Sequence, residues 1–91
     1  MAPPELILYG RSYCHLCEDM ERALRTLQDE FRFTVAVVDV DSDPALEARY
    51  GERVPVLVHA GKELCHYFLD PAAVRRYLTG VAGAALGTAA S

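Results

Sequence analysis

The sequence predicts a small α/β sandwich in which helices cover both faces of a four-stranded mixed sheet, in the order β-α-β-α-β-β-α. Two observations predict this fold class. Short apolar runs alternate along the chain with segments of helical periodicity. The chain has 91 residues, of which 52% are hydrophobic, and this size allows one domain with a modest core.

The first part of the chain predicts a strand, a helix and a second strand. The apolar run 6–9 ends at Gly10 and fits a buried strand. A helix is expected from about residue 15 to about residue 29. Its apolar face is predicted to consist of Leu16, Met20, Ala23, Leu24 and Leu27. Residues 33–40 are rich in β-branched side chains and predict a strand buried on both faces, parallel to the first because the crossover is right-handed.

A short helix and a hairpin follow. Asp43 and Pro44 are expected to cap and begin the helix, and Gly51 to end it. Residues 54–58 and 63–68 predict two strands, which pair antiparallel because only a tight turn joins them.

The last element is a helix that repeats the same start signal. Asp70 and Pro71 are expected to cap and begin it, and Gly80 to end it. We therefore predict one domain over residues 1–80 and an Ala/Gly-rich flexible tail over residues 81–91.

Charge and cysteine content exclude several classes of protein. The chain carries 9 basic and 13 acidic side chains, a net charge of −4, which argues against a nucleic-acid partner. Three cysteines are an odd and low number for a secreted disulfide scaffold. The first residues lack the basic and apolar regions of a signal peptide, and no apolar run is long enough to span a membrane. We expect a soluble, cytoplasmic monomer without a membrane partner.

The chemistry centres on Cys14 and Cys17, a C-x-x-C pair placed where the first strand gives way to the first helix. If Cys14 is the N-cap, the free N–H groups of the first turn favour its thiolate over its thiol. Cys17 lies one turn further and can attack a mixed disulfide on Cys14. The pair therefore predicts a nucleophile and a resolving cysteine. Arg11 and, when protonated, His15 could add positive charge, or could be exposed residues without a catalytic role.

Residues 8–17, followed by residues 53–57, resemble the thioredoxin superfamily and most closely its small glutaredoxin-like members. The resemblance covers residue 5 to about residue 79 and implies a thioredoxin-like three-layer sandwich. It implies a cis peptide bond before Pro55, and it makes Val54 and Pro55 candidates for contact with an extended substrate. Tyr13 could flank the same groove.

The resemblance implies a thiol-disulfide oxidoreductase that serves cell redox homeostasis and needs no bound cofactor, because the dithiol is the redox group. Its partners would be protein or low-molecular-weight disulfides, and its electron donor glutathione or a flavoprotein similar to thioredoxin reductase. The sequence departs from glutathione-using glutaredoxins, which have Gly-Gly-x-Asp after the fourth strand. Residues 65–70 are Cys-His-Tyr-Phe-Leu-Asp here. Asp70 could contact glutathione, but its simpler role is as the helix cap.

Two alternatives use the same residues. Cys14 and Cys17 could bind zinc together with Cys65 and either His66 or His15, or could hold an iron–sulfur cluster shared between two chains. Cys65 and His66 are adjacent, however, so they are expected to point to opposite faces of a strand. The other alternative is a redox-inert adaptor, against which the two intact cysteines argue.

Overall fold

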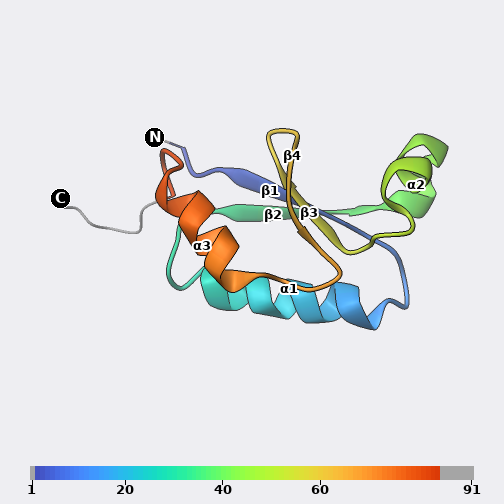
Figure 1. Cartoon of the computed structure of the whole chain (residues 1–91), viewed down its shortest axis with the longest axis horizontal. Coiled ribbons are helices and arrows are strands. Elements are labelled where there is room, and N and C mark those ends of the chain that lie inside the picture. The colour runs from blue at the N-terminus through green and yellow to red at the C-terminus, as the bar shows by residue number, and fades with distance from the viewer. Residues whose placement is uncertain (1, 85–91) are drawn as a thin grey trace.

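The fold is built on a four-stranded mixed sheet with the strand order β2-β1-β3-β4 (Figure 1). The computed structural model describes residues 2–84. β1 (Glu5–Gly10) pairs parallel with β2 (Thr34–Asp39) and antiparallel with β3 (Val56–His59), and β4 (Lys62–His66) pairs antiparallel with β3. The predicted element order and mixed sheet are confirmed.

Helices lie on both faces of this sheet. α1 (His15–Leu27) and α3 (Pro71–Thr79) pack on one face, whereas α2 (Pro44–Tyr50) packs on the other (Figure 1). The main core lies between the first face and its two helices, and its largest buried side chains are Leu6, Leu8, Met20, Leu24, Leu27, Leu57 and Leu78. A smaller cluster on the second face consists of Val40, Tyr50, Val56 and Val58.

Side-chain caps begin α2 and α3 as predicted. Asp43 accepts a hydrogen bond from the N–H of Ala45 at 2.9 Å, after the short 3-10 turn η1 (Val40–Ser42). Asp70 accepts one from the N–H of Ala73 at 3.1 Å. Each carboxylate satisfies a backbone donor that the first helical turn leaves free. Asp70 is therefore engaged as the helix cap.

The expected burial of the second strand is wrong. β2 is an edge strand, with β1 on one side and no further strand beside it among residues 2–84. Val37 is 58% exposed and the remaining side chains of β2 are exposed or half-buried. The run of β-branched residues predicts a strand correctly, but it carries no information on the order of strands in the sheet.

The ends of several elements also differ from the predictions. In the first turn of α1 the buried side chain is Cys17, whereas Leu16 is half-buried. β4 ends at His66 instead of residue 68, because Tyr67 has a positive φ of 63° that breaks the strand. The N–H of Tyr67 donates to the carbonyl oxygen of Pro55 at 2.9 Å.

The packed part of the chain extends beyond the expected boundary at residue 80. Ala84 is fully buried in the main core, and its carbonyl oxygen accepts a hydrogen bond from the N–H of Arg32 at 2.8 Å. The rest of the expected flexible tail, residues 85–91, lies outside the described residues. Across residues 2–84, none of the helices has the length and apolar character that crossing a membrane requires.

Candidate active site

Cys14 occupies the N-cap of α1, where the sequence predicts it. Its backbone is extended, with φ −113° and ψ 108°, and helical geometry begins at His15. The Cys14 Sγ accepts a hydrogen bond from the N–H of Cys17 at 3.1 Å. This sulfur therefore takes the place of the oxygen with which a serine or aspartate caps a helix, at the end where the helix dipole favours negative charge.

Cys14 and Cys17 are joined as a disulfide, and their Cα atoms are 5.2 Å apart. Cys17 is buried, with 8% of its surface exposed, whereas Cys14 is half-buried. Gly10 at the end of β1 leaves room for Cys17, since a Cβ at that position would lie 3.0 Å from its Sγ. Cys14 is thus the more exposed residue of the pair.

A hollow of about 330 Å³ opens beside the pair and brings several predicted site residues together. Arg11, Tyr13, Cys14 and Cys17 line it, whereas His15, Val54 and Pro55 do not. Tyr13 is fully exposed and has a φ of 58°, a conformation uncommon for a non-glycine residue. The predicted site residues therefore fall into two groups.

Arg11 is engaged by acidic side chains. Its Nη2 lies 3.2 Å from Glu47 of α2 and 3.6 Å from Asp41 of η1. The expectation that Arg11 adds positive charge beside the sulfur needs revision, because two carboxylates balance its charge. Arg11 instead ties the segment between β1 and α1 to α2.

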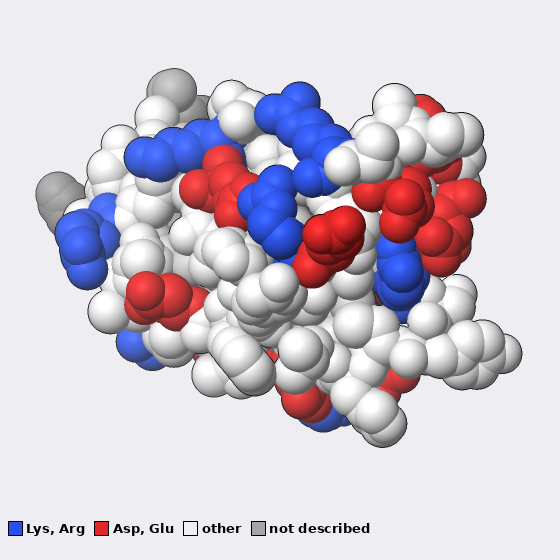
Figure 2. Space-filling view, turned by 45° about the vertical axis from the view of Figure 1, so that its right-hand side comes forward, with Lys and Arg blue, Asp and Glu red and all other residues white. Residues whose placement is uncertain are grey.

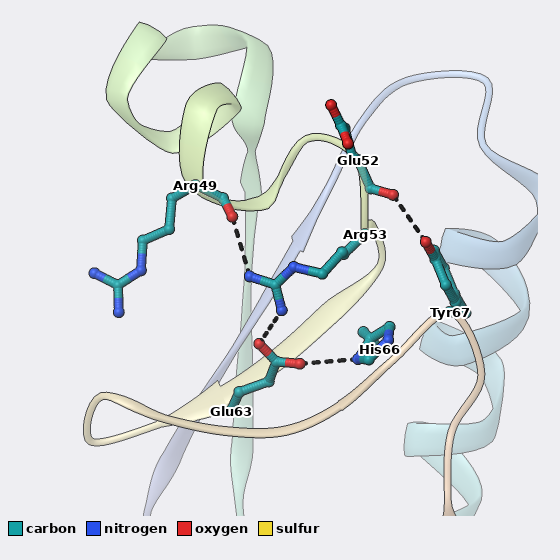
Figure 3. Close-up of polar contacts among 6 residues, drawn as sticks. All are labelled: Arg49, Glu52, Arg53, Glu63, His66 and Tyr67. Atoms are coloured by element: carbon teal, nitrogen blue, oxygen red, sulfur yellow. Dashed lines mark hydrogen bonds and ion pairs between the residues drawn. The ribbon is translucent and has the colours of Figure 1, made fainter.

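Val54 and Pro55 of the second group lie in the loop before β3, whereas His15 is the first residue of α1. The Val54–Pro55 peptide bond is cis, Pro55 is buried, and Val54 packs against the small cluster on the α2 face. The carbonyl oxygen of Pro55 is paired with Tyr67, and the hydroxyl of Tyr67 donates to the carbonyl oxygen of Glu52 at 3.1 Å (Figure 3). Two hydrogen bonds therefore connect the segment after β4 to this loop.

An ion-pair network holds the other side of the loop (Figure 3). Arg53 pairs with Glu63 of β4 and also donates to the carbonyl oxygen of Arg49 at 3.0 Å. His66 Nδ1 lies 2.9 Å from the second carboxylate oxygen of Glu63. Burial alone would raise the pKa of Glu63, but the hydrogen bonds from Arg53 and His66 outweigh it and hold the pKa below its usual range. The network links α2, the loop and β4.

Two aromatic residues that the sequence reasoning did not single out lie near the site. Tyr67 is 42% exposed and Phe68 is 67% exposed. With Leu16 and Ala23 of α1 they border a largely apolar hollow of about 240 Å³. The signal in the sequence was a run of three large apolar residues directly before the cap of α3, where a strand–helix connection is normally polar.

Cys65 does not join the cysteine pair. It is a half-buried free thiol packed against the main core. Burial, partly offset by a backbone hydrogen bond from Asp70, raises its pKa. Across residues 2–84, no three His, Cys, Asp or Glu side chains gather closely enough to hold a metal ion, so the ligand set of the zinc alternative is not assembled. As expected, His66 lies on the opposite side of β4, against Glu63.

Comparison with known proteins identifies the relatives of this chain. The family model of the Glutaredoxin-like domain (DUF836) matches residues 5–79. Uncharacterized proteins of Mycobacterium tuberculosis and Mycobacterium bovis are each 31% identical over 75 residues, which is 77% of this chain and 77% of the relative.

Several solved structures are also similar to this chain. A protein of Nitrosomonas europaea is 44% identical, with a TM-score of 0.79 over 85% of this chain and 93% of that one. A protein of X. campestris is 38% identical, with a TM-score of 0.70 over 84% and 97% of the two chains. A mutant thioredoxin of Halobacterium salinarum is 28% identical, with a TM-score of 0.57 over 84% and 72%. The fold is thioredoxin-like, as the resemblance implied.

Proposed function

Because this chain belongs to the glutaredoxin-like domain family, we propose that it reduces disulfides by thiol-disulfide exchange through Cys14 and Cys17. The observation that supports this proposal most directly is the hydrogen bond from the N–H of Cys17 to the Sγ of Cys14 at the start of α1. The same N–H and the helix dipole stabilise a thiolate on Cys14 once the disulfide is reduced. Cys14 is then the nucleophile.

The reaction balances with the two cysteines alone on the protein side. The Cys14 thiolate attacks one sulfur of a substrate disulfide, a bond forms between them, and the other substrate sulfur leaves as a thiolate that takes up a proton. Cys17 loses its proton and attacks the Cys14 sulfur, which releases the second substrate thiolate. Two electrons pass to the substrate, and the Cys14–Cys17 disulfide remains.

The residues around the pair are the proposed substrate contacts. Tyr13 and His15 flank Cys14 in the sequence and are both exposed. Val54 and Pro55 precede β3, and their loop is joined by hydrogen bonds to the segment that carries Tyr67. Arg11 acts through its ion pairs with Asp41 of η1 and Glu47 of α2, which hold the segment leading to Cys14.

The cycle closes when a thiol donor reduces the Cys14–Cys17 disulfide again. We propose glutathione or a flavoprotein of the thioredoxin reductase type as this donor. An insulin reduction assay, run in parallel with glutathione plus its reductase and with a thioredoxin reductase, measures the activity and identifies the donor in one experiment.

Cysteine variants test the division of labour between the two sulfurs. Cys14→Ser should abolish disulfide reduction, because the nucleophile is gone. Cys17→Ser should instead accumulate a mixed disulfide with the substrate, visible as a mass increase on Cys14. Cys65→Ser is the matched control and should retain activity, since Cys65 packs against the core away from the pair. Equal residual turnover in the Cys14 and Cys17 variants would refute the assignment.

A further inference from the structure

A continuous groove runs from the cysteine pair along the free edge of the sheet. The hollow beside Cys14 and a second one of about 190 Å³ have Glu21 and Val37 in common. One wall is a ridge of α1, and the floor is the side of β2 that carries Val37 and Val35. The α1 positions that line this wall recur at intervals of four and three residues, so the ridge follows the helix axis. We call this feature the β2 groove.

The groove has the shape of a site for an extended chain. β2 is an edge strand, so one side of its backbone has no strand partner among residues 2–84. Its six residues span about 20 Å at the usual rise per residue. An extended peptide can add to such an edge through main-chain hydrogen bonds while its side chains enter the groove. Val37, 58% exposed, supplies apolar surface in the middle.

The charge at the cysteine end of the groove is negative. Glu18, Glu21 and Asp39 line the hollow that contains Cys14. Arg25, which lines the second hollow, lies 4.0 Å from Glu21 and balances its charge, so Glu18 and Asp39 carry the negative charge there. Arg11 lines it too, but Glu47 and Asp41 balance its charge. Figure 2 shows further acidic side chains gathered at the α2 end of the molecule. A substrate sulfur that approaches Cys14 along β2 therefore passes carboxylates, which favour a cationic flank.

From this juxtaposition we propose that the β2 groove binds an extended polypeptide segment whose disulfide-bonded cysteine is flanked by lysine or arginine. The proposal rests on the proposed function and names its substrate class. The sulfur of the segment meets Cys14, its cationic side chains lie beside Glu18 and Asp39, and the backbone on one side of its cysteine follows β2. The chemistry is the exchange described above, with no further reactant.

Stopped-flow measurements with the pre-reduced protein test this proposal without an electron donor. Two peptides of equal length carry one cysteine in a mixed disulfide with 2-mercaptoethanol, flanked in one peptide by lysines and in the other by glutamates. Bis(2-hydroxyethyl) disulfide is the neutral reference. At low salt the lysine peptide should react about tenfold faster than the glutamate peptide, the lower end of electrostatic steering. In 1 M NaCl, where screening acts over about 3 Å, the ratio should fall toward one.

Charge variants locate the effect. Glu18→Gln combined with Asp39→Asn should reduce the tenfold preference to about twofold or less. The matched control combines Glu5→Gln with Asp29→Asn, which removes the same charge from exposed positions outside the groove. Asp29 lies beyond the C-terminal end of α1, whose 13 residues span about 20 Å. The control should keep the full preference. Each rate is divided by the rate with the neutral disulfide, which corrects for any change in the reactivity of Cys14.

The outcomes separate the two proposals. If none of the three disulfides oxidises the cysteine pair, the proposed function fails. If all three do so but both peptides react equally, or the control loses as much preference as the groove variant, the groove proposal fails while the function stands. An NMR titration with a lysine peptide that has serine for cysteine should shift amide signals of β2. Shifts confined to the segment of Tyr67 and Phe68 would also overturn the proposal.

Discussion

Replacing Gly10 by alanine tests how closely the end of β1 packs against the cysteine pair. An added Cβ would lie 3.0 Å from the Sγ of Cys17 and 3.3 Å from its Cβ. Both distances are shorter than the 3.5–4.0 Å or so at which carbon contacts are favourable. Cys17 is buried in the first turn of α1 and cannot swing away into solvent. The helix or the strand must therefore shift.

The expected cost of this substitution follows from two opposing effects. Overfilling a packed core costs about 1–3 kcal/mol. Replacing glycine within a strand returns about 0.5–1 kcal/mol, because alanine loses less conformational freedom on folding. The difference is a loss of about 1 kcal/mol, which lowers the melting temperature of a domain of this size by about 4–8 °C.

Thermal unfolding followed by circular dichroism measures this loss, with the cysteines of both proteins reduced. Gly80→Ala is the matched control. Among residues 2–84, a Cβ at Gly80 would meet only the carbonyl oxygen of Tyr77, at an ordinary contact distance of 3.7 Å, and φ is −91° there. Gly80→Ala should leave the melting temperature unchanged or raise it slightly.

A double-mutant cycle assigns the loss to Cys17. Cys17→Ala removes the sulfur that the new methyl group would meet. Gly10→Ala should then cost at least about 0.5 kcal/mol less than it does beside an intact Cys17. If Gly10→Ala melts with the wild-type protein, or if its cost is the same with and without the Cys17 sulfur, the reasoning from this contact is wrong.

Two further predictions concern titrating groups outside the pair. The pKa of Glu63 is lower in the folded than in the unfolded protein, so its stabilising contribution is present at neutral pH and is lost as the pH falls through and below the usual glutamate range of about 4.3. Glu63→Gln should lower the urea midpoint at pH 7 by at most the equivalent of about 1 kcal/mol. At acid pH the midpoint of the variant should fall less steeply with decreasing pH than that of the wild type. If the midpoints of both proteins fall in parallel with pH, this reasoning is contradicted. The pKa of Cys65 is raised by burial, so in a variant with serine at positions 14 and 17 its alkylation by iodoacetamide should have a midpoint above the ordinary thiol value of about 8.5. A midpoint at or below that value would contradict the burial argument.

Local signals allowed much of the fold to be predicted. Asp43 and Asp70 each precede a proline, and both cap the helix that the proline begins. Cys14 directly precedes the segment of helical periodicity that begins at about residue 15, and it is the N-cap of α1. Each of these features depends on hydrogen bonds between residues two or three positions apart, so the sequence alone contains the necessary information.

Features that depend on distant parts of the chain could not be predicted. The partners of Arg11 come from η1 and α2, and nothing near Arg11 in the sequence indicates them. The edge position of β2 follows from the insertion of β1 between β2 and β3, which apolarity does not encode. The burial of Ala84 depends in the same way on its meeting the main core and Arg32.

The interior consists of two separate clusters, so the free energy of local unfolding is expected to differ between the two parts of the molecule. The main core encloses the buried faces of α1 and α3, whereas α2 rests on the small cluster around Tyr50. Amide protons of α2 and η1 should therefore exchange with solvent through local opening, well before those of β1 and α1. Cys14 begins α1, which packs on the main core, whereas Val54 packs against the small cluster. In the proposed reaction the nucleophile therefore belongs to the part expected to open last, and the proposed substrate contact Val54 to the part expected to open first.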